Sequence, residues 1–349
     1  MMMTQDRADG RFVLLDGIRG VAAILVMLLH SLPFPMLGYL AVDLFFLLSG
    51  FVLARGYGDI LSDPGQRRRF AISRVIRIEP LWLASLAIAI LPTAGMVLFD
   101  WGYWTPGVWL LAVVSAPFFI LLPYDNWGIP LNQPGWSLAY ELLANVVLLV
   151  IGARRWPVWA VVLIAGPLLL LGIKQWTGAD DTGWMTMSGN IPRVLFSFFL
   201  GVILYRLWRG GRVPRFGAPA WLLLLAPVPL YFYAGPHLKA YLALVIFVIH
   251  PLMIWLGASA RPTGSVARLA SWLGFISYGV YVLHAPVIML VEGLRFLLWN
   301  NNAQGYRPDL WTAGLVVPIT LVLAHWLTVR VEMPLQRWLK ARFLPRKAG

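Results

Sequence analysis

The sequence predicts an all-α fold, a polytopic integral membrane bundle of about ten transmembrane helices with one re-entrant or interfacial segment. Of its 349 residues, 60% are hydrophobic and 12% are charged, and a soluble core of this length does not need so many apolar residues. Apolar runs close to the about 20 residues that cross hydrocarbon recur throughout the chain. The sequence shows no internal repeat and no large soluble loop, which favours one membrane domain over residues 1–349.

Eleven apolar segments are candidate spans. In chain order they cover residues 14–32, 36–57, 80–99, 107–123, 136–153, 157–174, 192–208, 219–234, 238–257, 272–298 and 311–331. Basic residues concentrate in cytoplasmic loops, and every large group of Lys and Arg can lie there if the segment 107–123 does not cross. That segment is Trp-rich at its start and is interrupted by Pro106 and Pro117, which favours a re-entrant or interfacial hairpin. Ten spans with both termini in the cytoplasm result.

The charge pattern fits this topology and excludes several classes of function. Five of the 28 Lys and Arg residues stay toward the outside, namely Lys174, Arg193, Lys239, Arg295 and Arg307. The net charge of +13 does not indicate a nucleic-acid partner, because the basic residues lie between apolar runs and not on one amphipathic face. The chain has no cysteine, which excludes disulfides, thiolate catalysis and cysteine-ligated metals, and we expect no metal site. The amino terminus lacks a cleavable signal pattern, so we expect the first helix to remain.

The first apolar segment carries Arg19 near its start and His30 near its end. Eleven helical residues advance about 1100°, about 20° from three full turns, so the two side chains share one face about 16 Å apart. Burying a cation and an imidazole in lipid is costly unless both meet polar partners, and ionisable residues at membrane depth are therefore functional by default. For Arg19 the alternative is snorkelling to lipid phosphate, and for His30 it is a hydrogen bond to a neighbouring helix.

The predicted orientation assigns depths to the ionisable residues. Arg19 lies toward the cytoplasm and His30 toward the outer leaflet. Glu141 lies about two turns below the outer surface, and we expect it to be level with His30. A carboxylate beside an imidazole fixes its tautomer and raises its basicity. Ser277 and His284 share one face of another helix, because they are seven residues apart.

Seven motifs run in order along nearly the whole chain. They are Leu15-Asp16-Gly17-Ile18-Arg19 with His30, residues 42–51 (VDLFFLLSGF), 74–80 (RVIRIEP) and 136–141 (WSLAYE), Arg193 with Phe199-Leu200-Gly201, residues 276–284 (ISYGVYVLH), and Glu332-Met333-Pro334. Together they resemble the acyltransferase 3 family of membrane proteins. Residues 142–145 (LLAN) lack the second acid and the aromatic pair of members with an extra esterase-like domain, so the chain resembles the stand-alone form. Ala41 stands where a glycine often precedes Val-Asp, which is a mild departure.

The resemblance implies a ten-span bundle in the bacterial inner membrane. It also implies O-acylation, usually acetylation, of surface carbohydrates, lipids or small natural products. The donor implied is acyl-coenzyme A, a co-substrate and not a permanently bound cofactor. Arg19 and His30 match the essential Arg and His of the family, which have ten residues between them. Partners would be membrane lipids, the donor and a carbohydrate or lipid-linked acceptor.

The chemistry assigns a role to each candidate residue. His30 is the general base, because a histidine with a pKa near 7 suits proton removal from a hydroxyl, and Glu141 is its catalytic partner. Arginine forks bind phosphates, so the donor-binding candidates are Arg19, Arg74 and Arg77. Oxyanion or acceptor contacts are expected from Ser49, Trp136, Ser137, Tyr281 and His284. Structural polar roles are expected for Asp16, Asp43, Arg193 and Glu332, with Asp43 holding the first two helices together. Without cysteine, direct transfer is preferred over a covalent intermediate.

The sequence leaves two other classes of function open. A multi-span transporter or flippase would use the same intramembrane charges as a substrate path, and a sensor would need a partner surface. Inverted repeats or paired broken helices would favour the transporter, and the sequence shows neither. For the three remaining histidines, packing or helix-helix hydrogen bonding is the better interpretation; these are His237, His250 and His325.

Overall fold

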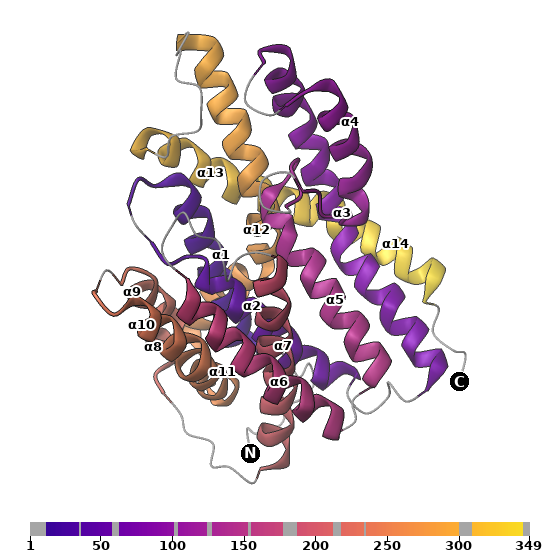
Figure 1. The fold of residues 1–349 in the computed structure, drawn as a ribbon, viewed down its shortest axis with the longest axis vertical. Helices are drawn as coiled ribbons and strands as arrows, with labels where there is room; N and C mark the ends of the chain where they lie inside the picture. Colours follow the sequence, from indigo (N-terminus) through magenta and orange to yellow (C-terminus); the bar gives the residue numbers. More distant parts are fainter. Residues whose placement is uncertain are drawn as a thin grey trace.

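The computed structural model describes residues 12–34, 36–57, 63–100, 104–123, 128–152, 155–176, 187–211, 218–233, 235–299 and 309–344. Within these ranges every regular element is a helix (Figure 1), which confirms the all-α prediction. The α-helices are α1 (Val13–Ser31), α2 (Leu40–Tyr57), α3 (Pro64–Leu98), α4 (Pro106–Ser115), α5 (Trp136–Ile151), α6 (Arg155–Gln175), α7 (Met187–Gly210), α8 (Ala220–Leu225), α9 (Pro227–Tyr231), α10 (Leu238–Leu244), α11 (His250–Ser259), α12 (Gly264–Trp299), α13 (Leu310–Leu327) and α14 (Met333–Phe343). Short turns of other helix types are η1 (Ala116–Phe118), η2 (Gln133–Gly135), η3 (Val245–Ile249) and η4 (Thr328–Glu332), the last two being π-helical.

Nine helical stretches in the described part of the chain are long and apolar enough to cross a membrane. The chain is therefore an integral membrane protein. The predicted span 219–234 is not among the nine, because it forms the short helices α8 and α9. The predicted positions of Arg307 and of both chain ends fall outside the described residues.

Contacts place α8 and α9 beside α1. The side chain of Leu224 packs against Gly17 near the start of α1. The carbonyl oxygen of Tyr231, at the end of α9, accepts a hydrogen bond of 2.7 Å from the backbone of Leu37, just beyond the end of α1. The pair therefore packs beside α1, and the stretch Ala220–Tyr231 is shorter than the nine that are long enough to cross.

The segment 107–123 does not cross, as the prolines predicted. Helix α4 has 10 residues, about 15 Å of length, which is half of the hydrocarbon thickness. It folds back along α3, where the Trp109 indole donates to the Thr93 hydroxyl (3.1 Å). The indole of Trp82, midway along α3, donates to the Ala116 carbonyl (3.0 Å). The chain therefore turns at the depth of Trp82 and starts α5 there, with Gly135 against the Trp82 ring.

Glycines allow α1 and α12 to pack with their backbones close together. On α1, Gly17 and Gly20 face Ala270 and Leu273 of α12, and a Cβ atom at Gly20 would overlap the Leu273 carbonyl. Small residues at such positions are the usual basis of helix association in lipid. Gly17 lies against Ala270 and His30 lies against His284. Because the residue numbers increase in the same direction along both helices, α1 and α12 run parallel. This close contact brings the polar stripes of both helices together.

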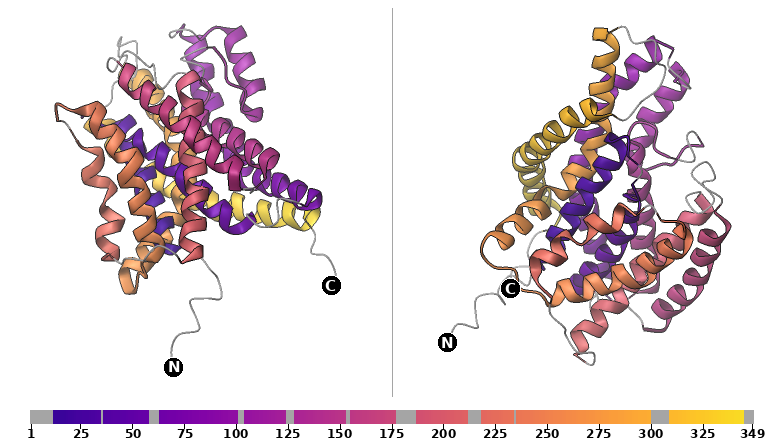
Figure 2. Two further views of the ribbon diagram at one scale, coloured as in Figure 1. Left: turned by 60° about the horizontal axis from the view of Figure 1, so that its bottom comes forward. Right: turned by 90° about the vertical axis from the view of Figure 1, so that its left-hand side faces the viewer.

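The carboxyl-terminal helix α14 lies beside the amino-terminal half of α3, at an angle to the rest of the bundle (Figure 2). The side-chain amide of Gln336 donates to the Arg77 carbonyl (3.3 Å) and to Glu332 (2.9 Å). The sequence placed Glu332 among the structural polar residues, and here its carboxylate forms an ion pair with Arg77. The end of the chain thereby fixes the part of α3 that carries the basic residues.

Candidate active site

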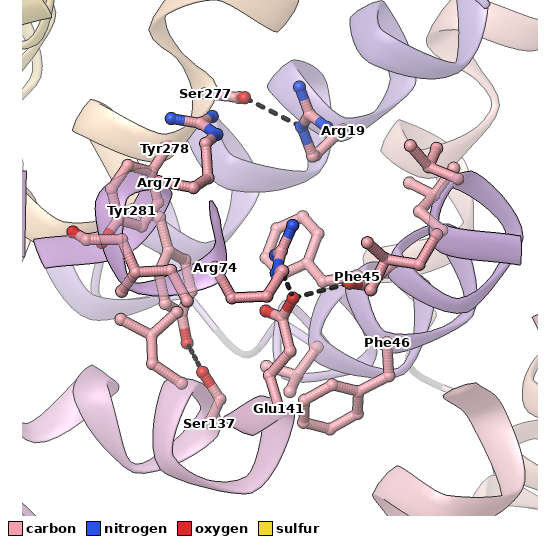
Figure 3. A pocket seen from close by; sticks show the side chains of 17 residues that line it. Arg19, Phe45, Phe46, Arg74, Arg77, Ser137, Glu141, Ser277, Tyr278 and Tyr281 are labelled. Atoms are coloured by element: carbon pink, nitrogen blue, oxygen red, sulfur yellow. Dashed lines mark hydrogen bonds and ion pairs between the residues drawn. The ribbon is translucent and has the colours of Figure 1, made fainter. Parts of the chain in front are cut away.

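A cavity of about 200 Å³ lies between α1, α2, α3, α5 and α12 (Figure 3). Its walls are apolar with a polar centre. The polar side chains that line it are Arg19, Ser49, Arg74, Arg77, Ser137, Glu141, Ser277, Tyr278 and Tyr281. The tertiary fold therefore gathers all three predicted donor-binding arginines around one space.

Glu141 joins three helices at the centre of the cavity. Its Oε1 accepts hydrogen bonds from the Ser49 hydroxyl (2.6 Å) and from the Arg74 guanidinium (3.2 Å). Arg74 and Glu141 are both mostly buried, with 19% and 16% of their side chains exposed. A partly buried ion pair of this kind holds its partners in a fixed geometry.

The expected pairing of Glu141 with His30 is corrected by this geometry. Ser137, at the start of α5, meets Tyr281 of α12 through hydroxyl groups 2.6 Å apart. Glu141 lies four residues after Ser137, toward the start of α1. His284, which contacts His30, lies three residues after Tyr281, toward the end of α1. The carboxylate and the imidazole pair are thus about 10 Å apart along the bundle axis. The sequence analysis placed Glu141 level with His30 because it assumed that α5 begins at the outer surface. In the structure α5 begins at the depth of Trp82, midway along α3.

Arg19 is held in place by its own helix and by α12. Its Nε donates to the Ser277 hydroxyl (3.0 Å) and a terminal nitrogen donates to the Gly274 carbonyl (3.3 Å). The same terminal nitrogen forms an ion pair with Asp16 one turn earlier (3.0 Å). Asp16 thus holds the Arg19 guanidinium from its own helix, while Arg19 still lines the cavity.

Arg77 is fixed from two sides. It forms the ion pair with Glu332, whose side chain is only 6% exposed. Its guanidinium also lies 5.2 Å from the centre of the Tyr278 ring, within range of a cation–π attraction. The Tyr278 hydroxyl in turn donates to the carbonyl of Ile78 (2.6 Å), which ties α12 to α3.

The residues proposed as oxyanion or acceptor contacts divide into two groups. Ser49, Ser137 and Tyr281 line the cavity. The lining, as far as the described residues show it, does not include Trp136 or His284. The Trp136 ring instead lies 5.8 Å from the Arg193 guanidinium.

His30 and His284 form a stacked pair beyond the cavity. Their ring centroids are 5.2 Å apart with 25° between the planes. The Nδ1 atom of His30 lies 3.0 Å from the Val26 carbonyl oxygen, and that of His284 lies 3.2 Å from the Val280 carbonyl oxygen. A carbonyl oxygen only accepts, so Nδ1 carries the hydrogen in both rings and the neutral rings keep a lone pair on Nε2. The Tyr281 ring, 5.9 Å from His284, stands between this pair and the cavity.

Asp43 and Arg193 form a fully buried bidentate ion pair. The two hydrogen bonds measure 2.9 and 2.7 Å, and the side chains are 1% and 0% exposed. The pair joins α2 to α7, which corrects the expectation that Asp43 holds the first two helices together. Sequence spacing could not reveal this contact, because the partner helix is about 150 residues away.

The structure also shows a positioning residue that the sequence analysis missed. Asn132, fully buried in the turn before α5, donates to the Ser85 hydroxyl (2.9 Å) and to the Val282 carbonyl (2.8 Å). It sets where α5 begins, and so the depth of Ser137 and Glu141. The available signal was a polar residue in an Asn-Gln-Pro-Gly turn directly before a helix. His250 fits the packing interpretation, because its Nε2 lies 3.1 Å from the Tyr231 hydroxyl.

A family model described as an acyltransferase domain, acyltransferase 3, matches residues 12–329. The chain belongs to the acyltransferase 3 family. It is therefore a membrane O-acyltransferase. No solved structure matches it.

Three relatives illustrate the range of this similarity. Protein 2 in the picA locus of Rhizobium radiobacter is 39% identical over 165 residues, 41% of this chain and 84% of that protein. The peptidoglycan O-acetyltransferase OatA of Listeria monocytogenes is 24% identical over 93% of this chain and 55% of that protein, so the chain spans about half of its length. The exopolysaccharide production protein ExoZ of Rhizobium meliloti is 27% identical over 73% of this chain and 78% of that protein.

Proposed function

We propose that this protein transfers an acyl group, with acetyl as the first choice, from acyl-coenzyme A to a hydroxyl of a carbohydrate or lipid-linked glycan. The observation that carries the proposal is the arrangement of three arginines around one cavity, with an imidazole pair beyond Tyr281. Two relatives are named for peptidoglycan O-acetylation and for exopolysaccharide production, and these names support a carbohydrate acceptor.

The arginine cavity is suited to the phosphate end of the donor. Guanidinium forks bind phosphate oxygens in pairs, and coenzyme A carries a diphosphate and a ribose phosphate. A long, thin arm separates these phosphates from the thioester. Arg19 and His30 are about 16 Å apart along α1, which suits a phosphate site and a reacting site held apart on one helix.

His30 is suited to accept the proton of the acceptor hydroxyl. With Nδ1 bound to the Val26 carbonyl, its Nε2 lone pair is the basic atom. In the proposed reaction the hydroxyl oxygen forms a bond to the thioester carbon as Nε2 takes the proton. The carbon–sulfur bond then breaks, and the proton passes from His30 to the leaving thiolate, which gives free coenzyme A and an ester.

Ser137 and Tyr281 are the best-placed donors for the developing oxyanion. Both hydroxyls lie close to the Pro134 carbonyl, at 3.1 and 3.0 Å, as well as to each other. A hydroxyl that turns from this carbonyl toward the oxyanion would stabilise it without moving the backbone. Ser49 is less suited to this role, because it already donates to Glu141.

The two ends of the site lie toward opposite sides of the bundle. The arginines lie near the start of α1 and the imidazole pair lies near its end. With the predicted topology, the donor would enter from the cytoplasm and the acceptor from the outer side of the inner membrane. This arrangement would deliver an acyl group to a surface glycan without moving the glycan inward.

The test is a comparison of a deletion strain with strains complemented by wild-type protein, His30→Ala or His325→Ala. Mass spectrometry of surface polysaccharide and lipids should show an acylated product with wild type and His325→Ala only. His325 is an exposed histidine near the end of α13, so its variant controls for histidine loss in general. If the deletion strain and the wild-type complement carry the same acyl groups, the proposal is wrong.

A further inference from the structure

A second cavity, a groove, lies outside the arginine cavity, on the surface of α6 and α10 that faces away from the rest of the bundle. Its volume is about 770 Å³, and its lining is apolar apart from two lysines. Its floor includes Gly166 of α6, against which the rings of Phe196 and Phe247 pack. Those rings lie 4.4 Å apart. This volume is in the range of pockets that hold one elongated ligand.

The groove follows the direction of α6. Its lining residues on this helix include Leu163, Gly166, Leu170 and Lys174, which recur at the spacing of one helical face. From Leu163 to Lys174 the helix rises about 16 Å, close to the depth of one leaflet of the hydrocarbon core. Leu163 is 68% exposed and Leu171 is 51% exposed, so the groove opens toward lipid.

The two lysines, Lys174 and Lys239, lie together at one end of the groove. Both are exposed, and the Lys239 ammonium donates to the Lys174 carbonyl (2.8 Å). Both belong to the five basic residues that the predicted topology places on the outer side, although Lys and Arg usually concentrate on the cytoplasmic side. Of the others, Arg193 is paired with Asp43 and Arg295 with Asp309 and Glu292. Neither lysine forms an ion pair with a carboxylate of the described residues.

We propose that this groove binds an anionic phospholipid of the leaflet at the end of α1, with one acyl chain along α6 and the phosphate against both lysines. A chain in the groove covers exposed apolar surface, and the phosphate supplies a negative charge beside two lysines that pair with no carboxylate of the described residues. An interfacial lysine favours anionic lipid by about fivefold, so two give about 30-fold. The lipid site is independent of the acyl-transfer proposal.

Native mass spectrometry of the purified protein can test this, with equal amounts of phosphatidylglycerol and phosphatidylcholine of the same chains. Wild type should retain phosphatidylglycerol at least about tenfold better than phosphatidylcholine. The double variant Lys174→Gln, Lys239→Gln should lose this preference. The matched control Arg261→Gln, Arg268→Gln removes two exposed charges elsewhere and should keep it.

A third variant tests the apolar part of the site. Ala243→Phe places a ring in the groove and should reduce the retention of both lipids. Equal retention of the two lipids by wild type would overturn the proposal. So would an unchanged preference in the lysine variant, or an equal loss in the arginine control, which would mean that any surface charge has the same effect.

Discussion

The imidazole rings of His30 and His284 lie face to face, 5.2 Å apart, and each binds through Nδ1 to a carbonyl one turn earlier in its own helix. The parallel packing of α1 and α12 creates this relationship. It leaves the Nε2 lone pair of His30 available as a base and places a second imidazole beside it. His284 is fully buried, and its Nε2 has no hydrogen-bond partner in the described part of the chain.

The first prediction concerns the base. His30→Ala should reduce acyl transfer by about 100-fold or more, the usual scale for loss of a general base, while donor binding stays unchanged. Transfer assays and calorimetry with coenzyme A on the same purified protein would measure both. His325→Ala should behave as wild type. Full activity of well-folded His30→Ala would remove His30 from the mechanism.

The second prediction concerns Arg19. Arg19→Lys keeps the charge but loses the planar fork, so it should weaken coenzyme A binding even though a lysine can still reach the cavity. Calorimetry on detergent-purified protein would show the loss, and Arg268→Lys, at an exposed position, is the control. If Arg19→Ala binds coenzyme A as tightly as wild type, then Arg19 only anchors α1 to α12.

The third prediction separates two roles for Glu141. Because Glu141 contacts Arg74 and Ser49, Glu141→Gln should disturb the cavity and raise KM for the donor several-fold. The dependence of kcat on pH should stay that of wild type, since His30 lies about 10 Å further along the bundle. A shifted pH profile with an unchanged KM would instead assign Glu141 to the base.

The fourth prediction concerns the contact between α2 and α7. A Cβ atom at Gly50 would overlap the Phe198 carbonyl, and one at Gly201 would overlap the Leu47 carbonyl. Gly50→Ala or Gly201→Ala should therefore lower the free energy of unfolding by about 1–3 kcal/mol, the usual cost of overpacking. Gly95→Ala meets open space on α3 and should be neutral or slightly stabilising. Thermal unfolding in detergent would rank the three, and equal melting temperatures would contradict the close packing.

The fifth prediction concerns topology. The chain has no cysteine, so single cysteines can be labelled in intact cells with an impermeant maleimide. Gly65→Cys and Gly210→Cys should be protected until lysis, and Pro236→Cys should react at once, because the predicted topology has the segment 219–234 crossing between positions 210 and 236. Asn126→Cys should also react, although position 126 is outside the described residues. Protection of position 236 together with position 210 would mean that α8 and α9 do not cross.

The sequence alone was enough to predict the class of this protein and most of its crossings. Apolar runs and the positions of Lys and Arg are local properties, and they act through the cost of placing polar groups in lipid. The spacing of Arg19 and His30 could also be read from helix geometry. Pro106 and Pro117 predicted that the segment 107–123 is interrupted, and its helix α4 is too short to cross.

Only the tertiary structure decided which residues meet. Glu141 pairs with Arg74 and not with His30, because Asn132 and the turn at Trp82 start α5 at mid-depth. Asp43 binds Arg193 because Gly50 and Gly201 bring α2 against α7. Sequence spacing fixes depth and face within one helix, whereas the partners across helices depend on which small residues allow two backbones to approach. That packing turned scattered polar residues into one cavity and one imidazole pair.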